Sequence, residues 1–285
     1  MTKEIDMKLI EFIKAIIIGI VEGITEWLPI SSTGHMILIN ELLSLEVSPA
    51  FEKLFLVVIQ LGAIAAVPVL FFNKLNPFAP SKSAEEKREC WSLWFKVIVG
   101  VIPAAVMGLL LDDFIDANLM HYAVVAAALI IYGVLFILIE KKREGKPYRV
   151  ERVEDLTYTD ALKIGALQVL SLVPGTSRSG STILGGMLTG VSREASAEFS
   201  FFMAIPIMIG ASGLKILKFF LDGFTASGAE ILLLLVGLLV SFLVSLFAIK
   251  FLMDFVKRHS FAPFGIYRIV LGILVLGYFL TTELI

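Results

Sequence analysis

Eight apolar stretches separated by polar connections dominate the pattern of hydrophobic and polar positions along the chain. Six of them are each long enough for one membrane-spanning helix, which needs about 20 apolar residues. These six stretches fall at 54–72, 95–111, 121–140, 199–221, 231–252 and 262–282. The pattern therefore predicts an all-α polytopic membrane protein with about six full transmembrane helices.

The other two apolar stretches, 8–45 and 161–190, are each interrupted near the middle by residues that break helices. Pro29 interrupts the first stretch and Pro174-Gly175 the second, and both breaks lie among polar residues. Irregular backbone at membrane depth is tolerated only where protein or water covers it. We therefore expect each stretch to form a re-entrant pair of half-helices, with the two polar tips meeting near the middle of the membrane.

The two halves of the chain resemble each other weakly, in the same order along the sequence. The matching positions are Gly19 with Gly165, Glu22 with Gln168 and, after a slip of one residue, Pro29 with Pro174, Ser32 with Ser177 and Thr33 with Arg178. The sequence thus predicts one integral membrane domain over 1–285. It contains a first copy at about 8–140, a linker at 141–160 and a second copy at about 161–282.

The charges in the connections predict how the chain is oriented. Lys and Arg gather at 73–95, 141–160 and 250–258, and membrane proteins keep such charges on the cytoplasmic side. The connections at 112–116 and 222–230 contain acidic residues and no Lys or Arg, so we expect them outside. This orientation makes the two copies inverted, as in transporters with a mid-membrane site. Both termini are then expected outside.

Composition agrees with a membrane protein and argues against other classes. The chain is 58% hydrophobic and 18% charged, whereas soluble domains carry about 25% charged residues. Its net charge of -2 and its lack of a basic tract give no indication of a nucleic-acid partner. Cys90 is the single cysteine, so the chain has no internal disulfide framework.

Two carboxylates precede the first break. Glu22 and Glu26 are four positions apart, so on a helix they share one face. Two like charges in apolar surroundings need a cation nearby, and a divalent ion with oxygen ligands, Mg²⁺ or Ca²⁺, is the natural partner beside a phosphate. The alternative is that one or both carboxylates face an aqueous vestibule and only hold the loop in place.

Three hydroxyl residues and a histidine follow Pro29: Ser31, Ser32, Thr33 and His35. If a helix begins here, its first N–H groups attract anions, and Ser31 and Thr33 are expected to help bind phosphate. Ser32 and His35 lie three positions apart, so His35 is a candidate general base for a Ser32 nucleophile. There are two alternatives: His35 itself attacks phosphorus, or His35 activates a water molecule that attacks it. The non-catalytic interpretations are a serine cap and a buried structural imidazole.

The second break supplies the remaining phosphate ligands. Gly175 lets the backbone approach a ligand closely, and the hydroxyls of Ser177, Ser179 and Thr182 can surround phosphate oxygens. Arg178 carries a planar fork that matches phosphate, and a guanidinium at this depth needs an anion. The alternative for Arg178 is an ion pair with Glu22 or with Glu26.

Other polar residues are expected to lie outside the site itself. They are Gln60, Gln168 and Glu198, which we expect to support it, and Arg268, which we expect at the membrane interface or in a local pair.

The two polar segments resemble the motifs of the undecaprenyl-diphosphatase family, the BacA-type bacterial enzymes linked to bacitracin resistance. The motifs are E-x-x-x-E running into P-x-S-S-T-G-H, here Glu22 to His35, and P-G-x-S-R-S-x-x-T, here Pro174 to Thr182. The resemblance implies hydrolysis of undecaprenyl diphosphate to undecaprenyl phosphate and inorganic phosphate, which recycles the lipid carrier for cell-wall polymers. It also implies a site open to the outer face of the bacterial plasma membrane, divalent-ion dependence, competition with bacitracin for the substrate, and a homodimer.

Two other functions fit parts of the same pattern. Inverted repeats with a mid-membrane site are typical of transporters, so a flippase for isoprenoid-phosphate lipids is the main alternative. A phosphate-recognising receptor without turnover is the second. Against both, Ser32, His35 and two carboxylates exceed what anion binding requires. Phosphate release by purified protein in detergent distinguishes these classes, because detergent provides no second compartment.

Overall fold

Six long apolar helices make up most of the molecule. The computed structural model describes residues 2–283, and within this range the secondary structure is helical except for one isolated bridge between Val150 and Val191. The helices long and apolar enough to cross a membrane are α3 (Pro49–Leu70), α5 (Ala84–Asn118), α6 (Tyr122–Arg143), α9 (Arg193–Leu221), α10 (Gly228–Arg258) and α11 (Ala262–Glu283). The prediction of an all-α fold with six helices long and apolar enough to span a membrane is confirmed.

Several spans begin earlier than their apolar stretches because polar caps set their starts. Ser83 and Glu86 form a capping box that starts α5 at Ala84, well before the apolar residues begin at 95. Ser227 and Glu230 do the same for α10. These caps satisfy N–H groups that the first turn of a helix leaves without partners. Hydrophobicity therefore located each span but not its first turn.

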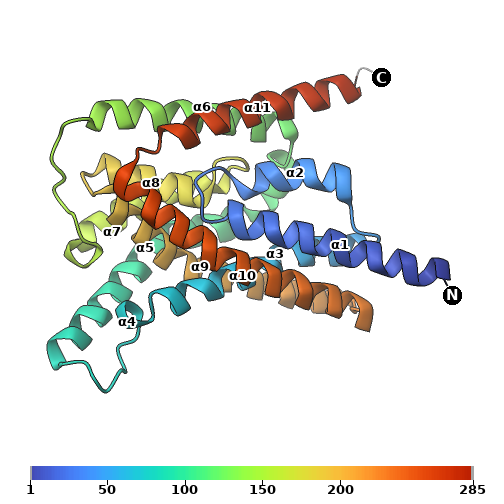
Figure 1. Ribbon diagram of the computed structural model, residues 1–285, viewed down its shortest axis with the longest axis horizontal. Helices are drawn as coiled ribbons and strands as arrows, with labels where there is room; N and C mark the ends of the chain where they lie inside the picture. The colour runs from blue at the N-terminus through green and yellow to red at the C-terminus, as the bar shows by residue number, and fades with distance from the viewer. Residues whose placement is uncertain (1, 284–285) are drawn as a thin grey trace.

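Each polar break separates two further helices. They are α1 (Thr2–Thr25) with α2 (Ser32–Leu43), and α7 (Tyr158–Gln168) with α8 (Arg178–Leu188), the second pair also containing the 3-10 turn η2 (Val169–Leu172). In Figure 1, α1 and α2 lie toward the end of the molecule that holds both termini. The connection after α6 and the start of α7 lie at the opposite end. The two polar breaks therefore approach the middle from opposite ends.

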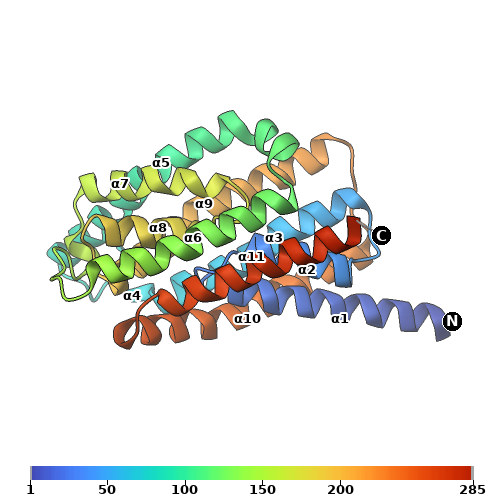
Figure 2. The same ribbon diagram turned by 90° about the horizontal axis from the view of Figure 1, so that it is seen from above.

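Helix α1 is longer than the half-helix expected at 8–45. It has 24 residues, which at 1.5 Å per residue gives about 36 Å. It packs along α10, as Figures 1 and 2 both show. A count of apolar residues alone underestimates this length, because the first residues of α1 include polar ones.

Close helix packing places the second polar break. Gly165 of α7 lies so near α5 that an added Cβ would be 2.0 Å from the Gly100 carbonyl oxygen. Small residues at such contacts let membrane helices approach closely. Beneath the first break, Trp27 is fully buried and meets the Phe201 ring of α9 edge-on.

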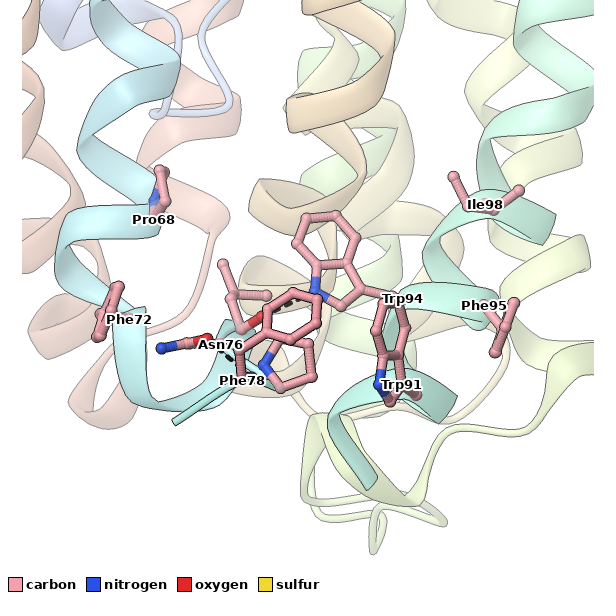
Figure 3. Close-up of a pocket in the computed structure, with 10 residues that line it drawn as sticks. Pro68, Phe72, Asn76, Phe78, Trp91, Trp94, Phe95 and Ile98 are labelled. Atoms are coloured by element: carbon pink, nitrogen blue, oxygen red, sulfur yellow. Dashed lines mark hydrogen bonds between the residues drawn. The ribbon is translucent and has the colours of Figure 1, made fainter. Parts of the chain in front are cut away.

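An apolar groove of about 490 Å³ lies away from the polar breaks, between the α3–α4 corner and the start of α5. Helix α4 is the short turn Phe72–Leu75. Figure 3 shows Trp91 and Phe95 on one side of this groove and Pro68 and Phe72 on the other. No ionisable side chain lines it, so it does not compete with the polar breaks as a site for phosphate chemistry.

Candidate active site

The two polar breaks have the same local geometry. Ser31 and Ser177 have φ angles of 72° and 73°, and they are the non-glycine residues with positive φ in the part of the chain that the structure describes. Each serine hydroxyl accepts a hydrogen bond from the N–H three residues later, from Gly34 at 3.2 Å and from Gly180 at 3.1 Å. L-residues rarely adopt such φ values, so both loops carry local strain of the kind found at functional sites.

This shared geometry corrects the register expected for the two breaks. The structure pairs Ser31 with Ser177 and Ser32 with Arg178. Gly19 and Gly165 have the same separation in the sequence, so the two segments match without a slip. The expected match of Ser32 with Ser177 was wrong by one residue because it kept Pro29 and Pro174 together, whereas the two loops place their prolines differently.

Backbone N–H groups at both helix starts have no acceptor within residues 2–283. They belong to Ser31, Ser32 and Thr33 at the start of α2 and to Ser177, Arg178 and Ser179 at the start of α8. A positive-φ residue followed by helical residues presents successive N–H groups in one direction and forms an anion-binding nest. Each break can therefore receive phosphate oxygens on its backbone.

The Glu26 carboxylate joins the two breaks. Ser32 Oγ donates a hydrogen bond to Glu26 Oε2 at 3.0 Å. Arg178 Nη2 and Nε donate to Glu26 Oε1 at 3.2 and 3.4 Å. Glu26 is nearly fully buried. The ion pair that was the alternative interpretation of Arg178 is thus present, and it links a hydroxyl, a carboxylate and a guanidinium in one chain of contacts.

The far side of Arg178 is held by α9. Its Nη1 donates to the Ser200 carbonyl oxygen at 2.8 Å and to Ser200 Oγ at 3.2 Å. Its guanidinium also lies 5.8 Å from the centre of the Trp27 ring. Sequence reasoning missed Ser200, whose only signal was a polar residue inside an apolar stretch, four positions after the buried Ser196 on the same helix face.

Glu22 lies one helical turn before Glu26, with its carboxyl against that of Glu26. Its side chain is 1% exposed, and its Oε1 has no hydrogen-bond partner. The described residues contain no group of three acidic, histidine or cysteine side chains for a metal ion. A Mg²⁺ or Ca²⁺ ion can nevertheless bind to two carboxylates alone, because water and phosphate oxygens can occupy its other coordination positions. The unpaired oxygen of Glu22 supports that fit.

His35 makes no hydrogen bond to Ser32. Its Nδ1 lies 2.7 Å from the Ser31 carbonyl oxygen, and its Nε2 lies 2.7 Å from the Tyr267 hydroxyl. A carbonyl only accepts, so Nδ1 carries the hydrogen and the neutral ring accepts from Tyr267 at Nε2. The expected pairing of Ser32 with His35 is therefore not found in this structure. Ser32 turns back toward Glu26, whereas His35, one turn later, faces α11.

The hydroxyls of α8 hold the loops together in this structure. Ser177 Oγ lies 3.1 Å from Ser179 Oγ, and Ser179 Oγ donates to the carbonyl oxygen of Glu26 at 3.2 Å. Thr182 Oγ1 lies 2.7 Å from Ser200 Oγ and 2.9 Å from the Arg178 carbonyl oxygen. Their contact with phosphate stays a prediction.

Gly175 is required by packing. Its φ is 91°, and a Cβ at this position would lie 2.4 Å from the Val125 carbonyl oxygen of α6. Its own carbonyl oxygen accepts a hydrogen bond from Arg268. The glycine therefore lets the second loop fit between α6 and α11, and a direct approach to phosphate stays a prediction.

A cavity of about 360 Å³ reaches the first break from the end of the molecule that holds the termini. Glu22, Ser32 and Thr33 line it, and Arg178 lies behind them, in contact with Glu26. Further out the lining residues are Met36, Ile37, Asn40 and Glu41 of α2, Leu56, Val57 and Gln60 of α3, and Met120. The α2 residues repeat at helical spacing from Ser32 and Thr33, which is the signal that would have found them.

The structure also shows the surroundings of three polar residues that were expected to lie outside the site itself. Gln168 is fully buried, and neither atom of its carboxamide has a partner. Glu198 pairs with Lys74 of α4 at 2.8 Å. Arg268 is fully buried, so its expected place at the membrane interface was wrong.

The family model described as bacitracin resistance protein BacA matches residues 15–274. An undecaprenyl-diphosphatase of Enterococcus faecalis is 54% identical over 267 residues, which cover 94% of this chain and 97% of the relative. Undecaprenyl-diphosphatases of Lactiplantibacillus plantarum and Desulfitobacterium hafniense are each 55% identical, over 95% and 96% of this chain and 98% of each relative.

Proposed function

The chain belongs to the BacA family, and on this premise we propose that it hydrolyses undecaprenyl diphosphate to undecaprenyl phosphate and inorganic phosphate. The observation that carries the proposal is the contact chain from Ser32 through Glu26 to Arg178. In this proposal Ser32 is the hydroxyl nucleophile, Glu26 accepts its proton, and Arg178 supplies positive charge near N–H groups that can bind phosphate.

In the first step, Ser32 Oγ attacks the terminal phosphorus of the diphosphate. Its proton passes to Glu26 Oε2, which lies 3.0 Å away. The bond from the terminal phosphorus to the bridging oxygen breaks, so the lipid leaves as its monophosphate and a phosphoryl group remains on Ser32. Glu26 takes the base role that the sequence had suggested for His35, because it is the group in contact with the hydroxyl.

In the second step, water attacks the same phosphorus and releases the enzyme. The bond from Ser32 Oγ to phosphorus breaks, and Glu26 returns its proton to Ser32. The oxygen and both hydrogens of the water leave on inorganic phosphate. Arg178 fixes the orientation of the Glu26 carboxylate and adds positive charge where the phosphoryl oxygens gather, which is the main requirement of phosphoryl transfer.

We also propose that Glu22 and Glu26 hold a divalent ion, Mg²⁺ or Ca²⁺. The support is that one guanidinium faces two buried carboxyls and that Glu22 Oε1 has no partner. Such an ion would neutralise phosphate charge and help to orient the diphosphate. Glu22→Gln should raise the metal concentration needed for half-maximal activity. Full activity in chelator would remove the ion from this proposal.

We propose that the two interrupted helix pairs are re-entrant, that they enter from opposite faces as inverted copies, and that the cavity opens to the outer face. The basic connection after α6 and the termini lie at opposite ends (Figure 1), which fits cytoplasmic placement of that connection. At the basic end, ion pairs join α4 to α9, through Lys74 and Glu198, and α6 to α9, through Glu140 and Arg193. At the other end Lys218 of α9 pairs with Asp112 of α5, so ion pairs do not distinguish the two ends. The cavity that reaches Ser32 from one end is the observation that favours a one-sided enzyme over a flippase.

Two partners follow from the same proposal. Bacitracin would act by competing with the enzyme for undecaprenyl diphosphate, which fits the description of the matching family. Assembly as a homodimer stays a prediction of the resemblance, and the oligomeric state in detergent tests it.

The deciding experiment measures phosphate release from undecaprenyl diphosphate by purified protein in detergent, for the wild type and for Ser32→Ala. The wild type should turn over, and Ser32→Ala should lose nearly all turnover while still binding substrate. Ser44→Ala is the control, since the exposed Ser44 hydroxyl makes no hydrogen bond among the side chains that the structure describes. Retention of more than about a tenth of the rate by Ser32→Ala, roughly 1.4 kcal/mol, would make the serine a ligand and not the nucleophile.

A further inference from the structure

A second buried arginine, Arg268 of α11, lies behind the two breaks and contacts both. Its side chain is 0% exposed. Its Nη1 donates to the Pro29 carbonyl oxygen at 3.1 Å. Its Nη2 donates to the carbonyl oxygens of Gly175 at 2.9 Å and Thr176 at 2.8 Å. One guanidinium thus bridges two loops that are far apart in the sequence.

The charge of Arg268 has no carboxylate partner among the residues that the structure describes. The guanidinium also lies over the Tyr132 ring, with its carbon 5.6 Å from the ring centre. A buried charge without an anion is costly, and here it is compensated by backbone carbonyls and an aromatic face. This arrangement differs from that of Arg178, which meets Glu26, so the two buried arginines have different tasks.

The contacts of Arg268 also orient the backbone of the second loop. In a trans peptide the carbonyl and the next N–H point in opposite directions. Because the Thr176 carbonyl points at Arg268, the Ser177 N–H points away from it. That N–H is one of the groups without an acceptor in the described part of the chain. Arg268 therefore turns the anion-binding side of this loop away from α11.

We propose that Arg268 is a positioning residue that holds the two loops at a fixed separation, so that Arg178 of one loop meets Glu26 of the other. Besides the Arg178–Glu26 contact itself, a neutral hydroxyl also links the loops: Ser179 Oγ donates to the carbonyl oxygens of Glu26 and Leu28. The expected effect of Arg268 on turnover rests on the proposed phosphatase function. The expected effect of Arg268 on the separation of the two loops does not depend on it.

Lysine is the informative replacement at this position. Arg268→Lys keeps the charge but has a single nitrogen, which lacks the planar fork needed to reach carbonyls of both loops at once. The guanidinium of Arg268 packs closely against Gly180 of α8. A Cβ added to Gly180 would lie 3.1 Å from Arg268 Nη1. The control is Arg193→Lys, where the arginine Nε meets Glu140 at 2.8 Å and a lysine can still reach that carboxylate.

The test measures hydrogen–deuterium exchange of peptides covering 26–34 and 173–181 together with steady-state kinetics in detergent. Arg268→Lys should raise exchange in both loops together and lower kcat by about 10- to 100-fold with little change in KM, because displaced groups lose catalytic alignment. Arg193→Lys should leave both loops unchanged. Faster exchange in one loop alone, or in neither, would overturn the inference.

These readouts separate the inference from the proposed function. If the wild type releases no phosphate, the phosphatase proposal fails, while the paired change in exchange still tests the bridge.

If Arg268→Lys does not accumulate as folded protein, the wild type is heated stepwise and hydrogen–deuterium exchange of the two loops is followed. The two loops should then open over the same temperature range, and opening at clearly different temperatures would contradict a shared clamp.

Discussion

At the scale of single residues, the structure changes the partner of the proposed nucleophile. Motif spacing identified Ser32, Glu26 and His35, but only the tertiary structure shows that Ser32 bonds Glu26. His35 instead meets Tyr267, which comes from α11 at the other end of the chain. Helical spacing limits which side chains can share a face, yet the direction of each side chain depends on neighbours distant in sequence. The residue types could be predicted and this pairing could not.

Glu26→Gln tests the new pairing. It keeps the shape of the side chain but cannot take the Ser32 proton, so kcat should fall by about 100-fold or more, in the range known for general bases. His35→Asn should lose less, because His35 touches the loop backbone and Tyr267 but not Ser32. The measurement is single-turnover phosphate release. A His35 variant slower than the Glu26 variant would return the base role to histidine.

Arg178→Lys tests the guanidinium that Glu26 and Ser200 hold. Lysine keeps the charge and loses the fork, so activity should fall by about 100-fold, roughly 2.7 kcal/mol. Product inhibition by inorganic phosphate, measured beside kcat, separates two roles. Weaker inhibition indicates direct phosphate binding, whereas unchanged inhibition with lower kcat indicates orientation of Glu26. A rate near that of the wild type would leave Arg178 as a structural counter-ion.

At the scale of elements, the sequence located both breaks because proline, glycine and polar residues interrupt apolar runs. It could not give the length of α1, whose first turns contain charged residues, nor the starts of helices set by caps. Hydrophobicity reports contact with lipid or core, whereas helix length depends on backbone hydrogen bonds that continue into polar surroundings. This difference explains why the breaks were placed well and the helix starts were not.

The start of α7 carries a prediction on stability. Asp160 lies in a capping box with Thr157 and also meets Arg149. Burial opposes its ionisation, but the hydrogen bonds from Thr157 and the contact with Arg149 outweigh this effect and lower the pKa of Asp160. Its stabilising effect is therefore present above the ordinary aspartate pKa of about 3.9 and is lost as the pH falls toward the lower pKa of the folded state.

Asp160→Asn should accordingly destabilise the protein by about 1 kcal/mol at pH 7, the usual cost of a lost cap interaction. The difference in Tm from the wild type should shrink as the pH falls below about 4. Asp155→Asn is the control, because Asp155 is exposed and its carboxylate makes no hydrogen bond among the described side chains. A difference that stays constant down to pH 3 would show that the Asp160 charge does not contribute.

At the scale of the whole molecule, the two ends differ in a way that bears on sidedness. The cavity that reaches Ser32 is lined by Glu41 and Met120 toward the end with the termini. The other end holds the connection after α6 and the Lys74–Glu198 ion pair. An enzyme that takes its lipid from one leaflet needs a path from one face only, whereas a flippase needs both ends to open in turn.

Labelling of single cysteines tests this sidedness in intact cells. In a Cys90→Ala background, Glu41→Cys should react with a membrane-impermeant maleimide, because Glu41 is exposed at the cavity. Lys146→Cys, in the exposed basic connection, should react only after the membrane is opened. If Lys146→Cys reacts in intact cells and Glu41→Cys does not, the orientation is reversed, and the phosphate would be released into the cytoplasm. If both react in intact cells, the basic connection does not lie where its charges predict, and the argument for a one-sided site loses its support.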